Sequence, residues 1–199
     1  TIIRITDKAT RAEIAKLAGN QKYVETAAEF FMFCADLKRA GNYCEAYEKP
    51  FEGDFTEHFI IATTDVALMA QSLVTAAESV GLGICYFGGI RNNPAEVSRI
   101  LQLPKGVYPV FGLCLGYPDQ DPEVKPRLPV SVIMKQEVYN EEGDKDSIAI
   151  YDEKIREYYK TRTGGGHAIS WSEQVASLLS EKSRPHMREF LEQQGFKFK

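Results

Sequence analysis

The stretch Thr56–Val80, TEHFIIATTDVALMAQSLVTAAESV, is the longest part of the sequence with a helical pattern. Apolar residues recur every seven positions within it, one set including Phe59 and Val66 and a second including Ala62 and Met69. Spacings of three and four residues place both sets on one broad face of a helix. We therefore expect a helix over 56–80 that packs in the core or across a dimer seam, and both roles can hold at once.

The predicted helix is long enough to cross a bilayer, but its polar residues argue against insertion. These are Glu57, His58, Asp65, Gln71 and Glu78. Across all 199 residues, 44% are apolar and 26% are charged, which is an ordinary balance for a globular protein. The net charge is −4, whereas a nucleic-acid-binding protein typically carries a basic surface. We expect neither nucleic acid nor a membrane as a partner.

Apolar segments on both sides of this helix predict the strands of a sheet. The run at 30–35 is continuous and apolar, which is typical of a central strand buried on both faces. Further strands are expected at 2–5, 84–87 and 107–115, and further helices at 7–18, from 93, and at 148–162, 171–181 and 184–194. Asp7 and Asn93 are the expected caps of the first two of these helices. We expect a single domain over 1–199, with excursions at 38–54 and 140–170.

The cysteines and histidines predict no metal site. Three of the four cysteines lie in apolar runs and no two have zinc-type spacing, which favours free thiols in a reducing compartment, here the cytoplasm. The four cysteines are Cys34, Cys44, Cys85 and Cys114. The three histidines, His58, His167 and His186, stand far apart in the sequence.

The segment Tyr86-Phe87-Gly88-Gly89-Ile90-Arg91 ends an expected strand in paired glycines. A glycine lacks Cβ, so its main-chain N–H can come within hydrogen-bonding distance of a flat ligand. The other interpretation is a turn that needs unusual backbone angles, and the pattern alone favours this turn.

The segment Lys125-Pro126-Arg127-Leu128-Pro129 is a second candidate site. Each proline pushes the preceding residue toward an extended conformation, in which residues two apart point to the same side. Lys125 and Arg127 can therefore converge on one anion, with arginine offering a fork that suits phosphate. A solvated basic loop is an equally good interpretation of the residues alone.

Two further segments are weaker candidates. Gly19-Asn20-Gln21 is typical of a helix end followed by a turn. The glycine run between Arg162 and His167 is typical of a flexible loop, although such a loop can fold over a nucleotide. The sequence contains no dinucleotide fingerprint, Walker A lysine or nucleophile elbow, which suits chemistry supplied by an organic cofactor.

Taken in order, these segments resemble the nitroreductase family, in its branch of oxygen-insensitive NADPH nitroreductases and NADPH–flavin oxidoreductases. The matching stretches are Thr1-Ile2-Ile3, Gly19-Asn20-Gln21, Phe33-Cys34-Ala35-Asp36, Ala76 to Gly83, Tyr86 to Asn93, Phe111-Gly112-Leu113, Lys125 to Pro129, Tyr151-Asp152, Tyr158-Tyr159 and Trp171-Ser172. They cover essentially the whole chain, and their order and spacing carry the resemblance.

The resemblance implies an α+β fold with a mixed, largely antiparallel sheet flanked by helices, in an intertwined homodimer. It implies FMN as cofactor, NADPH or NADH as co-substrate, and ping-pong hydride transfer to nitro compounds, quinones or free flavin. The implied FMN-binding residues are Gln21, Tyr86, Phe87, Gly88, Gly89, Ile90, Arg91, Lys125 and Arg127, and the implied nucleotide-binding residues are Arg162 and His167. No side chain is implied as a general acid. The rival expectation is a non-catalytic dimeric or flavin-binding remnant.

Two departures from the family pattern affect these expectations. Family members open with a His-x-Ser-x-Arg segment and a Ser-rich loop, which would lie upstream of Thr1. We expect the complete protein to carry this segment. His167 stands near the place of a further arginine in NADPH-specific relatives, so only a modest preference for NADPH is expected.

Overall fold

The computed structural model describes residues 1–162 and 168–199. Their contacts form two compact units, Thr1–Asp119 with Arg184–Lys199 as the first and Gln120–Ser183 as the second. The single domain expected over 1–199 stays a prediction.

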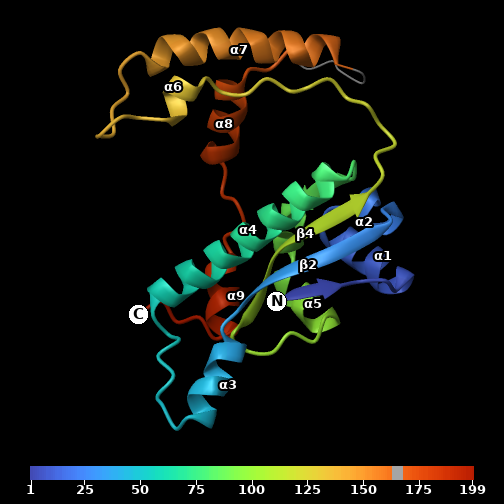
Figure 1. Ribbon diagram of the computed structural model, residues 1–199, viewed down its shortest axis with the longest axis vertical. Helices are drawn as coiled ribbons and strands as arrows, with labels where there is room; N and C mark the ends of the chain where they lie inside the picture. The colour runs from blue at the N-terminus through green and yellow to red at the C-terminus, as the bar shows by residue number, and fades with distance from the viewer. Residues whose placement is uncertain (163–167) are drawn as a thin grey trace. The chain divides into compact units, whose positions relative to one another are not determined.

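The first unit is built on a four-stranded sheet. Its strands are β1 (Ile2–Arg4), β2 (Glu29–Asp36), β3 (Gly83–Phe87) and β4 (Val107–Gly116). They lie in the order β1-β2-β4-β3, and each of the three pairings is antiparallel (Figure 1). All four expected strands are present, and the predicted α+β class with a largely antiparallel sheet is confirmed.

Strand β2 is buried on both faces, as its unbroken apolar sequence predicts. Phe30 and Met32 belong to one core cluster, whereas Phe33 and Ala35 belong to a second cluster. Successive side chains of a strand point to opposite faces, so a single strand supplies both cores. The helices around it are α1 (Lys8–Leu17), α2 (Lys22–Thr26), α4 (Thr56–Ser79), α5 (Pro94–Ile100) and α9 (Met187–Gln193).

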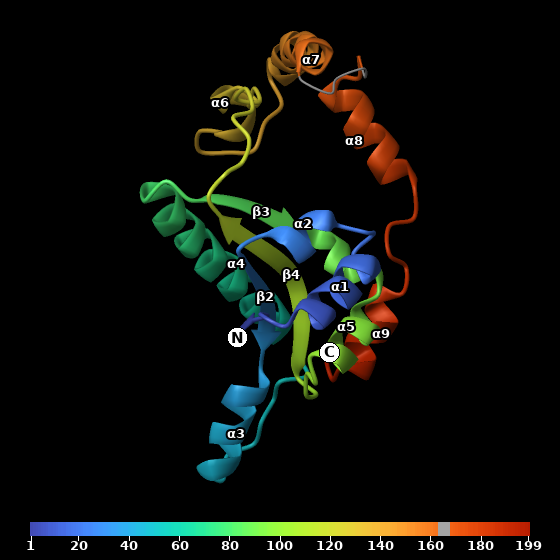
Figure 2. The same cartoon turned by 90° about the vertical axis from the view of Figure 1, so that its right-hand side faces the viewer.

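Helix α4 lies on one side of the strands, and α1, α2 and α5 lie on the other (Figure 2). The predicted helix is confirmed, but its buried stripe is narrower than expected. The residues that pack on the sheet are Ala62, Val66, Ala70, Val74 and Ala77. Met69, expected on this face, is 56% exposed because these mostly small residues, not Met69, face the sheet. By length and composition alone α4 could cross a membrane, a weak criterion that core helices also meet.

The helix starts expected from capping residues are confirmed. The side chain of Asp7 accepts a hydrogen bond from the Thr10 N–H at 2.7 Å. Asn93 accepts one from the Glu96 N–H at 3.4 Å, with Pro94 in the first helical turn. The last helix was expected from 184 but begins at Met187, because Arg184 has a φ of 50°, outside the helical region.

The expected excursions contain helices. Helix α3 (Lys38–Ala46) lies within 38–54. The second unit holds α6 (Val130–Ile133), which the sequence analysis did not predict, with α7 (Asp144–Thr161) and α8 (Trp171–Ser180). Helix α7 begins at Asp144 instead of 148, directly after Gly143 in the left-handed conformation. Its buried residues, Tyr151, Ile155 and Tyr158, form one helical stripe.

Arg11 joins α1 to α2 in a way that the sequence pattern does not reveal. Its side chain is buried, and its guanidinium donates to the carbonyl oxygens of Val24 and Ala27, both at 2.6 Å. A buried cation of this kind is tolerated because main-chain oxygens replace its lost water. Arg11 thereby fixes where the chain runs after Gln21.

Arg11→Ala should lower the free energy of unfolding by about 2–4 kcal/mol, because it leaves a buried and a partly buried carbonyl oxygen unpaired. Urea unfolding followed by circular dichroism measures this change. Arg99→Ala is the matched control, because Arg99 pairs with Glu96 at the surface and should have little effect. Equal stability losses in both variants would contradict the bracing role of Arg11.

Candidate functional site

In the first unit, the predicted residue Gln21 lies close to the segment that follows β3. This segment forms a short 3-10 helix, η1 (Gly88–Asn92). A Cβ placed on Gly19 would be 3.7 Å from Nδ2 of Asn92 and 3.9 Å from Nε2 of Gln21. Two amide side chains that are far apart in the sequence are thus gathered around the end of α1.

The paired glycines have a structural reason of their own. A Cβ on Gly89 would overlap the carbonyl oxygen of Ala18, so only glycine lets η1 pack against the end of α1. A Cβ on Gly88 would be 3.3 Å from Nη2 of Arg91. The absent Cβ of Gly89 therefore serves the packing of η1, and a flavin contact through the main chain of η1 stays a prediction.

The side chains of the segment 86–90 differ in what they can contact. Phe87 and Ile90 are buried in the first core cluster, so only their main-chain atoms remain for a ligand. Tyr86, on the opposite face of the strand, is 40% exposed and packs edge-on against Phe111 at 5.2 Å. Strand alternation explains this difference.

Arg91 is a partly buried cation that braces η1 against β4. Its guanidinium donates to the carbonyl oxygen of Val110. Burial lowers the pKa of Arg91, and the nearby positive charge of Arg184 lowers it further. Arg91 stays charged at neutral pH because arginine starts from a very high pKa. It therefore places a poorly solvated positive charge beside Gly88.

The segment preceding α9 holds η1 from the other side, which the sequence analysis missed. Nε2 of His186 lies 2.9 Å from the carbonyl oxygen of Arg91, and Nε of Arg184 donates to Oδ1 of Asn92 at 3.0 Å. Arg184-Pro185 is visible in the sequence, but there it indicates only a helix start. Spatial contact with η1 has no local sequence signal.

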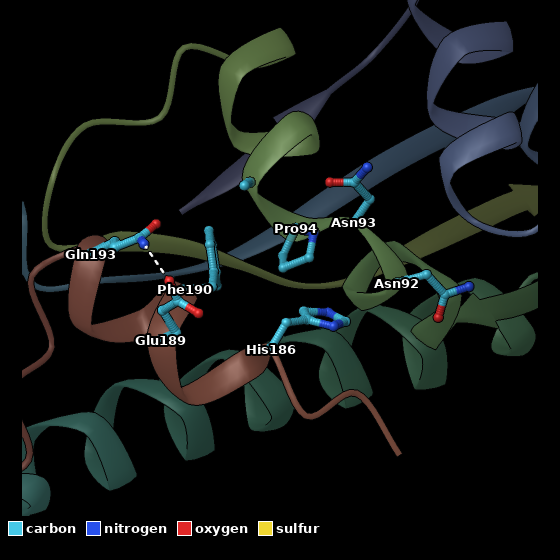
Figure 3. A pocket seen from close by; sticks show the side chains of 8 residues that line it. Asn92, Asn93, Pro94, His186, Glu189, Phe190 and Gln193 are labelled. Carbon is cyan, nitrogen blue, oxygen red and sulfur yellow. Dashed lines mark hydrogen bonds between the residues drawn. The ribbon is translucent and has the colours of Figure 1, made fainter. Parts of the chain in front are cut away.

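A pocket of about 250 Å³ opens beside this junction (Figure 3). It is lined by Asn92, Asn93, Pro94, Ala95, His186, Glu189, Phe190 and Gln193. Gln193 donates to Glu189 across one end of it at 3.1 Å. None of the predicted site residues that the structure describes lines this pocket.

In the second unit, Lys125 and Arg127 lie on a segment without helix or strand. Nζ of Lys125 donates to the Tyr159 hydroxyl at 2.8 Å and lies 5.1 Å from the centre of that ring. This hydrogen bond holds the pKa of Tyr159 below its usual value. Arg127 is exposed and donates from Nη1 to the Lys125 carbonyl oxygen at 3.1 Å.

Two further tyrosines of α7 anchor this segment by its main chain. The Tyr151 hydroxyl donates to the Pro126 carbonyl oxygen at 3.2 Å, and the Tyr158 hydroxyl to that of Glu123 at 3.5 Å. Tyr151 and Tyr158 lie on the buried stripe of α7. Their spacing was visible in the sequence, but their partners were not.

The predicted nucleotide-binding residues lie at and beyond the end of α7. Arg162 follows the last helical residue, and its guanidinium carbon is 5.9 Å from the centre of the Tyr158 ring. His167 and the glycine run lie in 163–167, outside the described residues. The structure thus gathers Gln21 with 86–91 in one unit, and Lys125 with Arg127 in the other.

Two family models match consecutive parts of the chain. One described as "Nitroreductase family" matches residues 1–117, and one described as "Nitroreductase family, C-terminal domain" matches residues 125–199. The chain is 44% identical to an NADPH-flavin oxidoreductase of Vibrio harveyi over 195 residues, covering 98% of the chain and 79% of that protein. It is 42% identical to the oxygen-insensitive NADPH nitroreductase of Salmonella typhimurium over 196 residues, covering 98% and 80%.

Solved structures show the same similarity. NfrA1 of B. megaterium superposes with a TM-score of 0.94 at 45% identity, covering 99% of the chain and 81% of that structure. The NADPH:FMN oxidoreductase from Vibrio harveyi complexed with NAD+ superposes with a TM-score of 0.90 at 42% identity, covering 100% and 80%.

Gly89→Ala should displace η1 from the end of α1, because the new methyl group overlaps the Ala18 carbonyl. We expect about 1–3 kcal/mol lower stability together with weaker FMN binding, measured by urea unfolding and by flavin fluorescence titration. Gly116→Ala is the control, since its Cβ would make an ordinary 3.4 Å contact with Ala28. If Gly89→Ala is less stable but binds FMN as tightly as wild type, η1 is not part of the flavin site.

Proposed function

The chain belongs to the nitroreductase family, and from this we propose that it is an FMN-dependent oxidoreductase that takes hydride from NADPH, or less efficiently NADH, and passes it to nitro compounds, quinones or free flavin. The observation that carries the proposal is similarity over nearly the whole chain to relatives named NADPH-flavin oxidoreductase, nitroreductase and FMN reductase (NADPH). Small-molecule electron acceptors fit this activity.

The residues present fit the chemistry of FMN. A flavin has a flat ring with a polar edge and a phosphate group at the far end of its side chain. The partly exposed amide of Gln21 and the main chain of η1 suit the polar edge. Lys125 and Arg127 suit the phosphate, since both are cations on one short segment. Bound FMN would supply two-electron chemistry, accepting hydride in one half-reaction and delivering it in the next.

The protein's own part is binding and orientation. The Tyr159 hydroxyl holds Lys125 by a hydrogen bond, so this ammonium is positioned before phosphate arrives. Arg127 leaves most of its guanidinium exposed, ready for a forked contact. Arg91 adds a fixed positive charge beside Gly88, where it would favour negative charge on a bound ring. We assign no catalytic side chain.

Arg162 is the residue that we propose to contact the 2′-phosphate of NADPH. It is exposed at the end of α7, and its contact with the Tyr158 ring leaves its N–H groups free of any carboxylate among the described residues. Arginine is well matched to a phosphate group. We propose the cytoplasm as the site of action, in keeping with four free cysteines.

We also propose that a second copy of the chain covers the outer face of α4. Four large apolar side chains of α4, Ile60, Ile61, Leu68 and Met69, are more than half exposed. Large apolar side chains grouped on one exposed helix are typical of an interface. A homodimer would bury them.

Arg127→Ala tests the function and its phosphate site together. FMN-loaded wild type should oxidise NADPH with a nitroarene or with free FMN as acceptor. In the variant, FMN affinity should fall about ten- to hundredfold through loss of a charge-assisted contact, with the rate at saturating FMN preserved. Lys154→Ala, an exposed change on α7, is the control. Unchanged FMN affinity would remove the phosphate assignment, whereas flavin binding without NADPH oxidation would indicate a non-catalytic flavin-binding protein.

Met69→Asp should convert a dimer to monomers or insoluble protein, because a buried, unpaired carboxylate is costly at an apolar interface. Sedimentation velocity measures the oligomeric state. Asn42→Asp adds the same charge on the exposed face of α3 and should leave the dimer intact. A stable wild-type monomer would refute the proposed interface.

A further inference from the structure

Two of the free cysteines face one another across neighbouring strands. Cys85 on the edge strand β3 is the direct partner of Cys114 on β4. The pair two positions along on the same face consists of Gly83 and Gly116. Directly opposed residues on antiparallel strands project their side chains to the same side of the sheet. The two cysteine side chains therefore leave the same side of the sheet at directly opposed positions.

The spacing of opposed residues comes close to what a disulfide requires. Opposed Cα atoms lie about 4.5–5.5 Å apart, which falls within the range of about 4.4–6.8 Å seen in disulfides. Opposed Cβ atoms lie about 4.5–5.5 Å apart, whereas a disulfide brings them to about 3.5–4.5 Å. A closure of about 1 Å is needed. Within the described sheet β3 pairs only with β4, and the adjoining glycine pair has no side chains to resist it.

The two sulfur atoms differ in accessibility. Cys85 is exposed, whereas Cys114 is buried and its thiol donates to the Tyr23 carbonyl oxygen at 3.2 Å. A small oxidant can reach Cys85 from solvent. Cys114 is shielded by α2, and it is directly opposite Cys85 in the register of the sheet.

We propose that Cys85 and Cys114 form an oxidisable pair that hydrogen peroxide converts to an intramolecular disulfide. The Cys85 thiolate attacks one peroxide oxygen, the O–O bond breaks, and the departing hydroxide takes up the proton that the thiol had released, so that a sulfenic acid and water result. The Cys114 sulfur then attacks the Cys85 sulfur, the S–O bond breaks and a second water leaves. In sum, two thiols and one peroxide give one disulfide and two waters.

The environment makes this reaction slow, which distinguishes the pair from a catalytic thiol. Partial desolvation by its neighbours raises the pKa of the Cys85 thiol, although its side chain is still open to solvent, and burial raises the pKa of Cys114 to about 12. Since the thiolate is the reacting form, oxidation should accelerate with rising pH. The neighbouring Cys85 contributes to the raised pKa of Cys114, in agreement with their proximity.

The position of the pair links it to the candidate site. Cys85 directly precedes Tyr86, so a disulfide would tie β3 to β4 at the entry to η1. A flavin reductase working in air would generate peroxide, because reduced flavin reacts with dioxygen. This source of peroxide rests on the proposed function. When peroxide is added instead, oxidation of the pair does not depend on the proposed function.

The test is intact-protein mass spectrometry after incubation with hydrogen peroxide at mildly alkaline pH, with peptide mapping under non-reducing conditions. Wild type should lose the mass of two hydrogen atoms and yield a linked peptide pair holding Cys85 and Cys114, reversed by dithiothreitol. Cys44→Ser should behave like wild type. Cys85→Ser, an exposed change that should fold normally, should form no disulfide.

Three outcomes would overturn the proposal. One is oxygen addition at Cys85 while Cys114 stays reduced, and another is a disulfide between two chains through Cys85. The third is complete retention of both thiols at a peroxide concentration that oxidises exposed methionines such as Met134. Since NADPH oxidation is not measured, these outcomes are independent of the enzymatic proposal.

Discussion

The pairing of β2 with β4 is the interaction on which the first unit depends. Both strands are largely buried, and their alternating side chains supply one core facing α1 and another facing α4. Because both faces of β2 are apolar, its register depends on how individual side chains fit the two cores, and a slip by one residue would move each side chain to the other core. In this sheet β1 pairs with the free edge of β2 and β3 with the free edge of β4, and η1 follows at the end of β3.

Features that depend on neighbours in the sequence could be predicted from the sequence. Asp7 and Asn93 cap helices because their partners lie three residues away, and α4 follows from its own periodicity. Contacts between distant segments could not be predicted in this way. The carbonyl partners of Arg11, and the His186 contact with Arg91, are properties of packing that leave no spacing pattern. The periodicity of α4 also placed Met69 on the buried face, although Met69 is exposed. Apolar residues occur on both faces of α4, so a seven-residue repeat alone does not show which face is buried.

The candidate site shows the same division. Tyr86 to Arg91 and Lys125 to Arg127 were found from their chemistry and their resemblance to a family. The physical reason for their composition emerged only from the structure. Gly89 is required by the Ala18 carbonyl, and Lys125 is oriented by a tyrosine of α7. Residue types that a ligand-binding site would explain can therefore also be required by internal packing.

The second core cluster includes Phe190, Leu191 and Phe196, which pack with β2 and α4 although the whole second unit separates them in the sequence. During synthesis, a nascent chain that has already exposed β2, α4 and β4 must wait for these three side chains to leave the ribosome. Until then part of its apolar surface stays uncovered. The second unit is made during that interval, so the second core is completed only after the second unit has been synthesised.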